Sequence, residues 1–280
     1  MPTLDPRANP NDAAPLRIGV LTRSEAQLQR WQFESLRRLL QRPGVQLALV
    51  VVDPRTASDH PPTLADTGGV LWRNYYRHYL LPRSTALQPV PSGEIFADVA
   101  RLAPILRRRS KWTEEFANHD VEAIRRERLD LLVRYGFGIL RGEILSAAKW
   151  GIWSYHLGDP WAYRGGPPCF WEVVHGARHT HCILQRLTPK LDSGIILGRT
   201  SVPTNTLSYL RHLDSVASAA APLLSKAADL LRRNPNAIEG LPQCASTAPI
   251  RHAPGDVEFL RFCSLITARR FSSYVVRRTT

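Results

Sequence analysis

Two apolar runs that flank a helical stretch near the N-terminus constrain the fold most strongly. Residues 16–21 and 45–52 are rich in Leu, Val and Ile, as buried strands are. Between them, residues 25–41 carry apolar side chains at three- and four-residue spacing, and Pro43-Gly44 ends the predicted helix. A strand, a helix and a second strand with short connections form a parallel βαβ unit. The sequence therefore predicts an α/β protein with a Rossmann-like, mostly parallel sheet flanked by helices.

The rest of the chain continues this alternation of strands and helices. We expect further strands at residues 129–135, 151–156, 180–187 and 195–202, and helices at residues 112–128, 142–148, 169–175 and 207–233. We also expect an amphipathic helix in the aromatic patch at 72–76 and a third early strand around Ile105. The predicted organisation is a flexible lead-in (1–15), one α/β domain (16–233) and a short C-terminal extension (234–280).

The composition is that of an ordinary globular chain apart from its charge. The 280 residues are 44% hydrophobic and 22% charged, and no uncharged apolar run of about 18 residues predicts a membrane span. The formal net charge of +13 can indicate a nucleic-acid partner. However, only four of the 37 basic residues are lysines, and the arginines are scattered. We therefore interpret the charge as a compositional bias, and a basic RNA-binding protein that uses residues 257–280 is the weakest alternative.

Cysteine usage and the N-terminus predict a cytoplasmic protein without a metal site. No CxxC pair occurs, and residues 1–15 lack the apolar core of a secretory signal. We therefore expect reduced thiols and no structural zinc. His175, His179 and His181 surround Cys182 at ligand-like spacing, but the predicted strand there favours surface or core histidines. Cys169 is expected to be a packing residue.

The segment 131–194 carries the polar residues that can perform chemistry. His156 ends a predicted strand and precedes a loop rich in glycine and proline, and Asp192 lies in a later Leu-Asp-Ser-Gly turn. A histidine and a carboxylate at neighbouring strand ends can perform general acid–base catalysis. No GxGxxG or GxxxxGK[ST] motif for a nucleotide accompanies them. From the residues alone, a catalytic pair and a structural or solvated pair both remain open.

Four short motifs follow one another in this segment. They are Tyr135-Gly136 with Ile139-Leu140, then Ser154-Tyr155-His156, then Tyr163-Arg164-Gly165-Gly166-Pro167-Pro168, and finally Leu191-Asp192-Ser193-Gly194. In this order and spacing they resemble the catalytic N-terminal domain of the folate-dependent formyltransferases, which include the methionyl-tRNA formyltransferases and the amino-sugar N-formyltransferases. The resemblance is good over about 130–200, plausible over 16–130 and poor beyond 235.

The resemblance implies the formyltransferase fold and a transferase of one-carbon metabolism, with 10-formyltetrahydrofolate as the formyl donor and no metal. It implies that the folate lies against a strand and turn made of Tyr135, Gly136, Phe137, Ile139 and Leu140. It implies an acceptor-binding loop made of Arg164, Gly165, Gly166 and Pro167.

The resemblance also implies a role for each catalytic position. The acceptor amine attacks the formyl carbon, His156 stabilises the resulting oxyanion, and Asp192 shuttles the proton. The chief departure is Ser154, where the family has Asn, because a serine offers one hydroxyl donor in place of an amide NH2. The hydroxyl could still reach the oxyanion. The alternative is a catalytically altered or inactive relative that binds folate or a partner.

The expected acceptor is a small-molecule amine, such as an amino sugar, a nucleotide sugar or a specialised metabolite. Formyltransferases that act on tRNA carry a downstream β-barrel, and residues 234–280 lack the strand alternation of a barrel. A tRNA-binding domain is therefore not expected. Arg134, Arg141 and Arg164 would suit a phosphate or carboxylate on the acceptor, with structural ion pairs as the alternative. The oligomeric state stays open, a homo-oligomer included.

Overall fold

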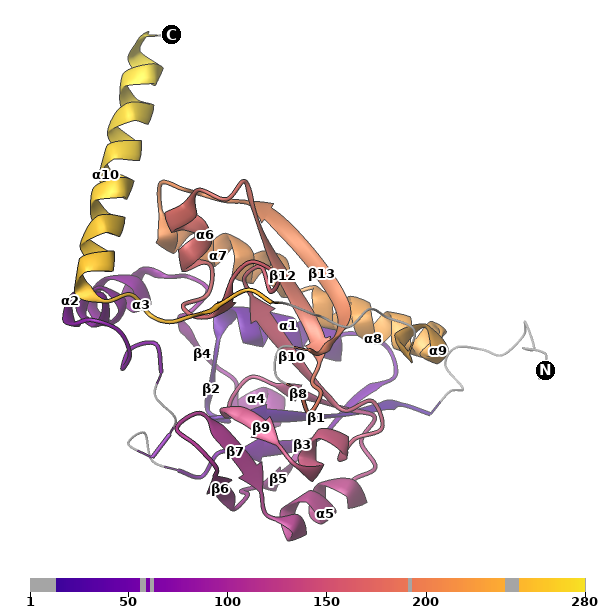
Figure 1. Cartoon of the computed structure of the whole chain (residues 1–280). Coiled ribbons are helices and arrows are strands. Elements are labelled where there is room, and N and C mark those ends of the chain that lie inside the picture. Colours follow the sequence, from indigo (N-terminus) through magenta and orange to yellow (C-terminus); the bar gives the residue numbers. More distant parts are fainter. Residues whose placement is uncertain (1–13, 56–58, 61–62, 191–192, 240–246, 280) are drawn as a thin grey trace.

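A seven-stranded sheet forms the centre of the folded structure (Figure 1). The computed structural model describes residues 14–55, 59–60, 63–190, 193–239 and 247–279. In spatial order the strands are β13 (Ile195–Pro203), β12 (His179–Arg186), β10 (Ile152–Leu157), β8 (Leu131–Arg134), β1 (Leu16–Thr22), β3 (Val45–Val52) and β5 (Ala100–Leu102). The strands from β10 to β5 are parallel, and β12 and β13 are antiparallel at one edge. The predicted α/β class with a mostly parallel, Rossmann-like sheet is confirmed.

Helices cover both faces of this sheet. Buried strand side chains alternate between two hydrophobic clusters, one under each set of helices, because successive side chains of a strand point to opposite faces. One face is covered by α1 (Arg30–Leu40), α7 (Tyr209–Ala220) and α8 (Leu223–Arg233), and the other by α5 (Asn118–Arg126) and the 3₁₀-helix η2 (Glu143–Ser146). Three short helices connect other parts of the chain: α4 (Gly93–Phe96), α6 (Phe170–His175) and α9 (Pro235–Glu239).

The same alternation determines where the polar strand ends point. Leu132 and Ile152 belong to the cluster under α5 and η2. Residues two positions further along a strand share the face, so Arg134, Ser154 and His156 follow them on that side of the sheet. All three residues lie at the carboxyl ends of parallel strands, where ligands of open α/β sheets bind.

The predicted helix at 112–128 is correct only in its second half, because a strand precedes α5. A three-stranded sheet is formed by β6 (Leu106–Arg108), β7 (Thr113–Phe116) and β9 (Ile139–Arg141). β7 pairs on both sides, antiparallel with β6 and parallel with β9, and these hydrogen bonds hold its residues extended. The early strand predicted within residues 100–110 is present as β5, which pairs with β3, but its predicted position around Ile105 is wrong. Ile105 lies between β5 and β6 and is 60% exposed.

Two other helix predictions differ from the structure at their boundaries. The first helix begins at Arg30 rather than near residue 25, because β2 (Gln27–Gln29) pairs with β4 (Pro89–Pro91). The predicted helix at 207–233 is divided into α7 and α8 at Pro222, which lacks an N–H to continue the first helix.

The C-terminal helix α10 (Asp256–Thr279) packs its first half on the aromatic patch near residue 72, which is helical as predicted. The patch is formed by α2 (Val70–Asn74), the π-helix η1 (Tyr75–Leu80) and α3 (Leu81–Arg83). Phe259 and Phe262 are buried, and the ring of Phe262 lies 4.8 Å from that of Phe170. The helix stays attached through Ile266, which is 7% exposed, and through Arg270, whose Nε donates to the carbonyl of Leu207 at 2.7 Å. Beyond these contacts α10 projects away from the body (Figure 1), and Phe271 is 70% exposed. Within the described ranges, no helix combines the length and the apolarity needed to cross a membrane.

We predict that Phe262→Ala lowers the free energy of unfolding by about 3 kcal/mol, because it removes a buried aromatic side chain from the main core. Phe271→Ala is the matched control on the same helix and changes that free energy by less than about 0.5 kcal/mol. Both changes alter helix propensity equally. Urea denaturation measures the two values, and equal stability of the two variants would show that α10 adds nothing to the core.

Candidate active site

A cavity of about 160 Å³ lies where β10 ends beside β8 and β9. Ser154 and His156 line it together, Ser154 at 2% exposure and His156 half-buried. The structure therefore brings together two of the three predicted catalytic residues, and Asp192 lies outside the described residues. The other lining residues are Arg134, Ile139, Leu140, Arg141, Tyr155, Gln185, Leu187, Thr188, Lys190 and Gly194.

Arg134 makes three hydrogen bonds in the wall of this cavity. Its Nη1 donates to Ser154 Oγ at 2.9 Å, and its Nη2 donates to the carbonyl oxygens of Phe137 at 3.2 Å and Gly138 at 2.8 Å. Burial lowers the pKa of Arg134 to about 10, which still leaves the guanidinium charged at neutral pH. The sequence left open whether Arg134 suits an anionic acceptor or makes structural contacts, and the structure shows its guanidinium hydrogen-bonded within the protein.

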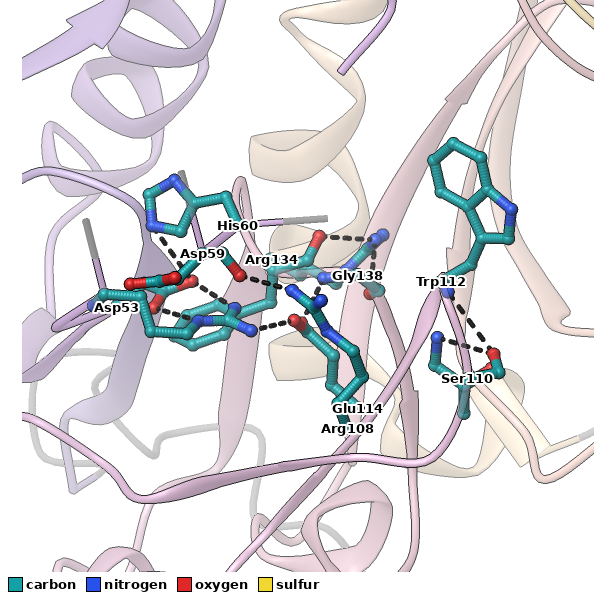
Figure 2. Close-up of polar contacts among 12 residues, drawn as sticks. Asp53, Asp59, His60, Arg108, Ser110, Trp112, Glu114, Arg134 and Gly138 are labelled. Atoms are coloured by element: carbon teal, nitrogen blue, oxygen red, sulfur yellow. Dashed lines mark hydrogen bonds and ion pairs between the residues drawn. The ribbon is translucent and has the colours of Figure 1, made fainter. Parts of the chain in front are cut away.

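Buried charges support the turn that Arg134 holds. Glu114 Oε2 accepts from the backbone N–H of Gly138 at 2.5 Å, and Glu114 Oε1 lies 2.5 Å from Arg55 Nη1. Arg55 in turn donates to Asp53 through Nε at 2.8 Å and Nη2 at 2.5 Å. The side chains of Asp53 and Glu114 are fully buried, and buried carboxylates require such partners. Figure 2 shows Asp53, Glu114, Arg134 and Gly138 gathered in this one network. Glu114 was missed from the sequence, where it looks like one charged residue of a helix.

The predicted folate contacts are divided between two cavities. Ile139 and Leu140 line the cavity of Ser154 and His156, whereas Tyr135, Gly136 and Phe137 line a second cavity of about 300 Å³. This second cavity lies at the carboxyl ends of β1 and β8, and most of its lining is polar. Its other lining residues are Thr22, Arg23, Ser24, Gln27, Leu28, Gln29, Gln32, Leu87 and Pro89. Sequence reasoning missed it, although polar residues directly after the first strand were the available signal.

The predicted acceptor loop is held against the C-terminal segment and lines neither of these two cavities. β11 (Arg164–Gly165) pairs in parallel with β14 (Ile250–Arg251), and Arg164 Nη1 donates to the carbonyl of Ala248 at 3.1 Å. Gly165 has φ +88°, and a Cβ there would lie 2.2 Å from the carbonyl oxygen of Arg251. A glycine is therefore required at this position of the loop. Gly166 and Pro167 follow it, and the Gly166 N–H donates to the same carbonyl at 3.0 Å.

A second polar cluster shapes the loop that follows His156. Glu172 Oε1 accepts from the backbone N–H of Asp159 at 2.9 Å, and burial raises the pKa of Glu172 to about 7. The carboxylate of Asp159 lies 3.1 Å from His181 Nδ1 on the neighbouring strand β12. The loop is therefore attached to both α6 and β12.

The cysteines and histidines that resembled a ligand set do not gather at one point. Cys169 is 1% exposed, and burial raises the pKa of its thiol well above the usual value, so the reactive thiolate is disfavoured. This agrees with the predicted packing role. His175 contacts the hydroxyl of Tyr163 at 3.2 Å, and His179 is exposed. Across the described residues, no three His, Cys, Asp or Glu side chains are arranged to hold a metal ion.

Comparison with curated proteins finds similarity to methionyl-tRNA formyltransferases. The chain is 32% identical to the methionyl-tRNA formyltransferase of Bacillus mycoides over 132 residues, which cover 46% of this chain and 38% of that protein. The chain therefore spans about a third of the length of the curated relatives it matches. No family model matches the chain.

Comparison with solved structures finds the same fold in proteins of low sequence identity. Phosphoribosylglycinamide formyltransferase from Anaplasma phagocytophilum has a TM-score of 0.52 at 17% identity, over 79% of this chain and 88% of that one. A formyltetrahydrofolate deformylase from Pseudomonas syringae pv. tomato has a TM-score of 0.51 at 12% identity, over 80% of this chain and 63% of that one. The chain is therefore similar in sequence to methionyl-tRNA formyltransferases over part of its length, and it shares its fold with these solved structures.

Proposed function

We propose that this chain transfers a formyl group from 10-formyltetrahydrofolate to the amine of a small-molecule acceptor. The observation that carries the proposal is the shared position of Ser154 and His156, which lie on the same strand, point to the same face and line one cavity. The similarity to formyltransferases in sequence and fold supports the same chemistry. The sequence-based domain division and the cytoplasmic location stay predictions.

In this proposal, bound 10-formyltetrahydrofolate supplies the formyl group, and the chain stabilises the charge and moves the proton. The Ser154 hydroxyl and the His156 imidazole donate hydrogen bonds to the oxyanion that forms when the amine attacks. Each preorganised donor of this kind contributes about 3 kcal/mol of transition-state stabilisation. Asp192, by its resemblance to the family position, accepts the proton of the amine and supports its delivery to N10. The bond between N10 and the formyl carbon then breaks, and tetrahydrofolate leaves. Ile139 and Leu140 give the cavity an apolar wall, and its volume of about 160 Å³ suits the formyl-bearing part of the donor.

We assign the acceptor to the polar cavity of about 300 Å³ on the other side of the turn. Its lining offers the hydroxyls of Thr22 and Ser24, the guanidinium of Arg23 and three glutamine amides. Such groups bind sugar hydroxyls, phosphates and carboxylates. This assignment replaces the acceptor loop predicted at 164–167, which the C-terminal segment engages. It also moves residues 135–137, predicted as folate contacts, to the acceptor cavity.

We predict that His156→Gln lowers kcat for formyl transfer by about 100- to 1,000-fold, because an oxyanion donor is lost. Release of tetrahydrofolate from 10-formyltetrahydrofolate, followed with a panel of amino sugars, nucleotide sugars and other amines, measures the rate. His179→Gln is the matched control at an exposed position and keeps kcat within about twofold. Equal rates in the two variants would refute the role of His156.

We predict that Asp192→Asn lowers kcat by about 100-fold or more while folate binding is retained, because the proton acceptor is lost and the size is kept. The exposed Asp98→Asn is the control and keeps the wild-type rate. Retained turnover in Asp192→Asn would refute the proposed proton transfer. A wild-type protein that binds the folate by calorimetry but formylates no amine of the panel would instead favour the non-catalytic alternative.

A further inference from the structure

Arg134 and Ser154 are neighbours by strand register as well as by side-chain contact. The parallel pairing of β8 with β10 places Arg134 opposite Ser154. Both side chains point to the face that carries His156, and all three line the same cavity. The guanidinium therefore lies beside the hydroxyl in the wall of this cavity.

The direction of their hydrogen bond determines what the hydroxyl can do. An arginine side chain carries only donors, so Ser154 Oγ is the acceptor of the 2.9 Å bond from Nη1. A serine hydroxyl has one hydrogen, and this bond leaves that hydrogen to be donated elsewhere. Ser154 is 2% exposed and lines the cavity, and we infer that this hydrogen is donated to an acceptor oxygen bound there.

We propose that Arg134 is a positioning residue for formyl transfer that acts through the Ser154 hydroxyl: its hydrogen bond to Oγ orients the O–H toward the oxyanion and polarises it. The inference rests on the proposed function. A charge two hydrogen bonds from the developing oxyanion stabilises the transition state more than the neutral ground state, because the negative charge exists only there.

The surroundings of Arg134 hold the guanidinium in one orientation. Its Nη2 is fixed by the carbonyls of Phe137 and Gly138, and Gly138 is held in turn by Glu114. Its Nε is buried and makes no hydrogen bond within the described part of the chain. Because three hydrogen bonds hold the guanidinium in place, little reorganisation is needed when negative charge develops on the substrate.

A double-mutant cycle between Arg134 and Ser154 tests the inference. Arg134→Gln, which keeps a donor and removes the charge, is expected to lower kcat by about 10- to 100-fold with the KM for the folate within about threefold. In the Ser154→Ala background the same change is expected to alter kcat by less than about twofold. Arg134→Lys, which keeps the charge, is expected to restore kcat to within about fivefold of wild type.

Arg17→Gln is the matched control, since Arg17 also donates to a backbone carbonyl, that of Glu127, but at the opposite end of the sheet. It keeps kcat and KM. Circular dichroism and thermal melting show whether Arg134→Gln folds. If it does not, the cycle is run with Arg134→Lys, and the smaller decrease in kcat that this change causes must disappear in the Ser154→Ala background. If the Arg134 change lowers kcat equally in the wild-type and Ser154→Ala backgrounds, the inference is overturned and the proposed function still stands. Absence of turnover in the wild-type protein overturns the proposed function and the inference together.

Discussion

The charge of Arg134, removed from bulk water at the carboxyl edge of the sheet, governs the structure around the candidate site. Desolvation of a guanidinium is costly, and the protein offsets it with the carbonyls of Phe137 and Gly138 and with the nearby carboxylate of Glu114. The turn after β8 must therefore present its carbonyls inward. The strand β7 must bring Glu114 into the interior, where Arg55 in turn offsets the charge of the carboxylate.

The local sequence pattern was sufficient for most of the central sheet. The strands β3, β10, β12 and β13 were predicted to within a residue or two, because long apolar or alternating runs determine a strand without reference to distant partners. The pattern failed at residues 112–117. There the polar run Thr-Glu-Glu becomes β7 through pairing with β9, which lies about 25 residues further along the chain. The secondary-structure propensity of a short segment contains no information about a strand that pairs with it from elsewhere in the chain.

The residues of the candidate site that belong to a sequence motif could be predicted. The contacts that depend on the register between two strands could not. Ser154 and His156 follow from the resemblance, and the structure places both in one cavity. The contact between Arg134 and Ser154 depends on how two strands align, and the sequence shows only that an arginine ends an apolar strand. The same holds for the loop at 164–167. Its glycines look like a flexible loop in the sequence, but Gly165 is needed because the backbone of Arg251 lies too close for a Cβ.

The pairing of β11 with β14 joins residues that are about 85 positions apart, and it has a consequence for biosynthesis. A chain emerges from the ribosome in order, so residues 164 and 165 appear long before their partners at 250 and 251. The loop that follows His156 thus lacks one of its supports while α7 and α8 are being synthesised. The sheet can form first, and the region around the candidate site becomes complete only when the C-terminal segment has joined it.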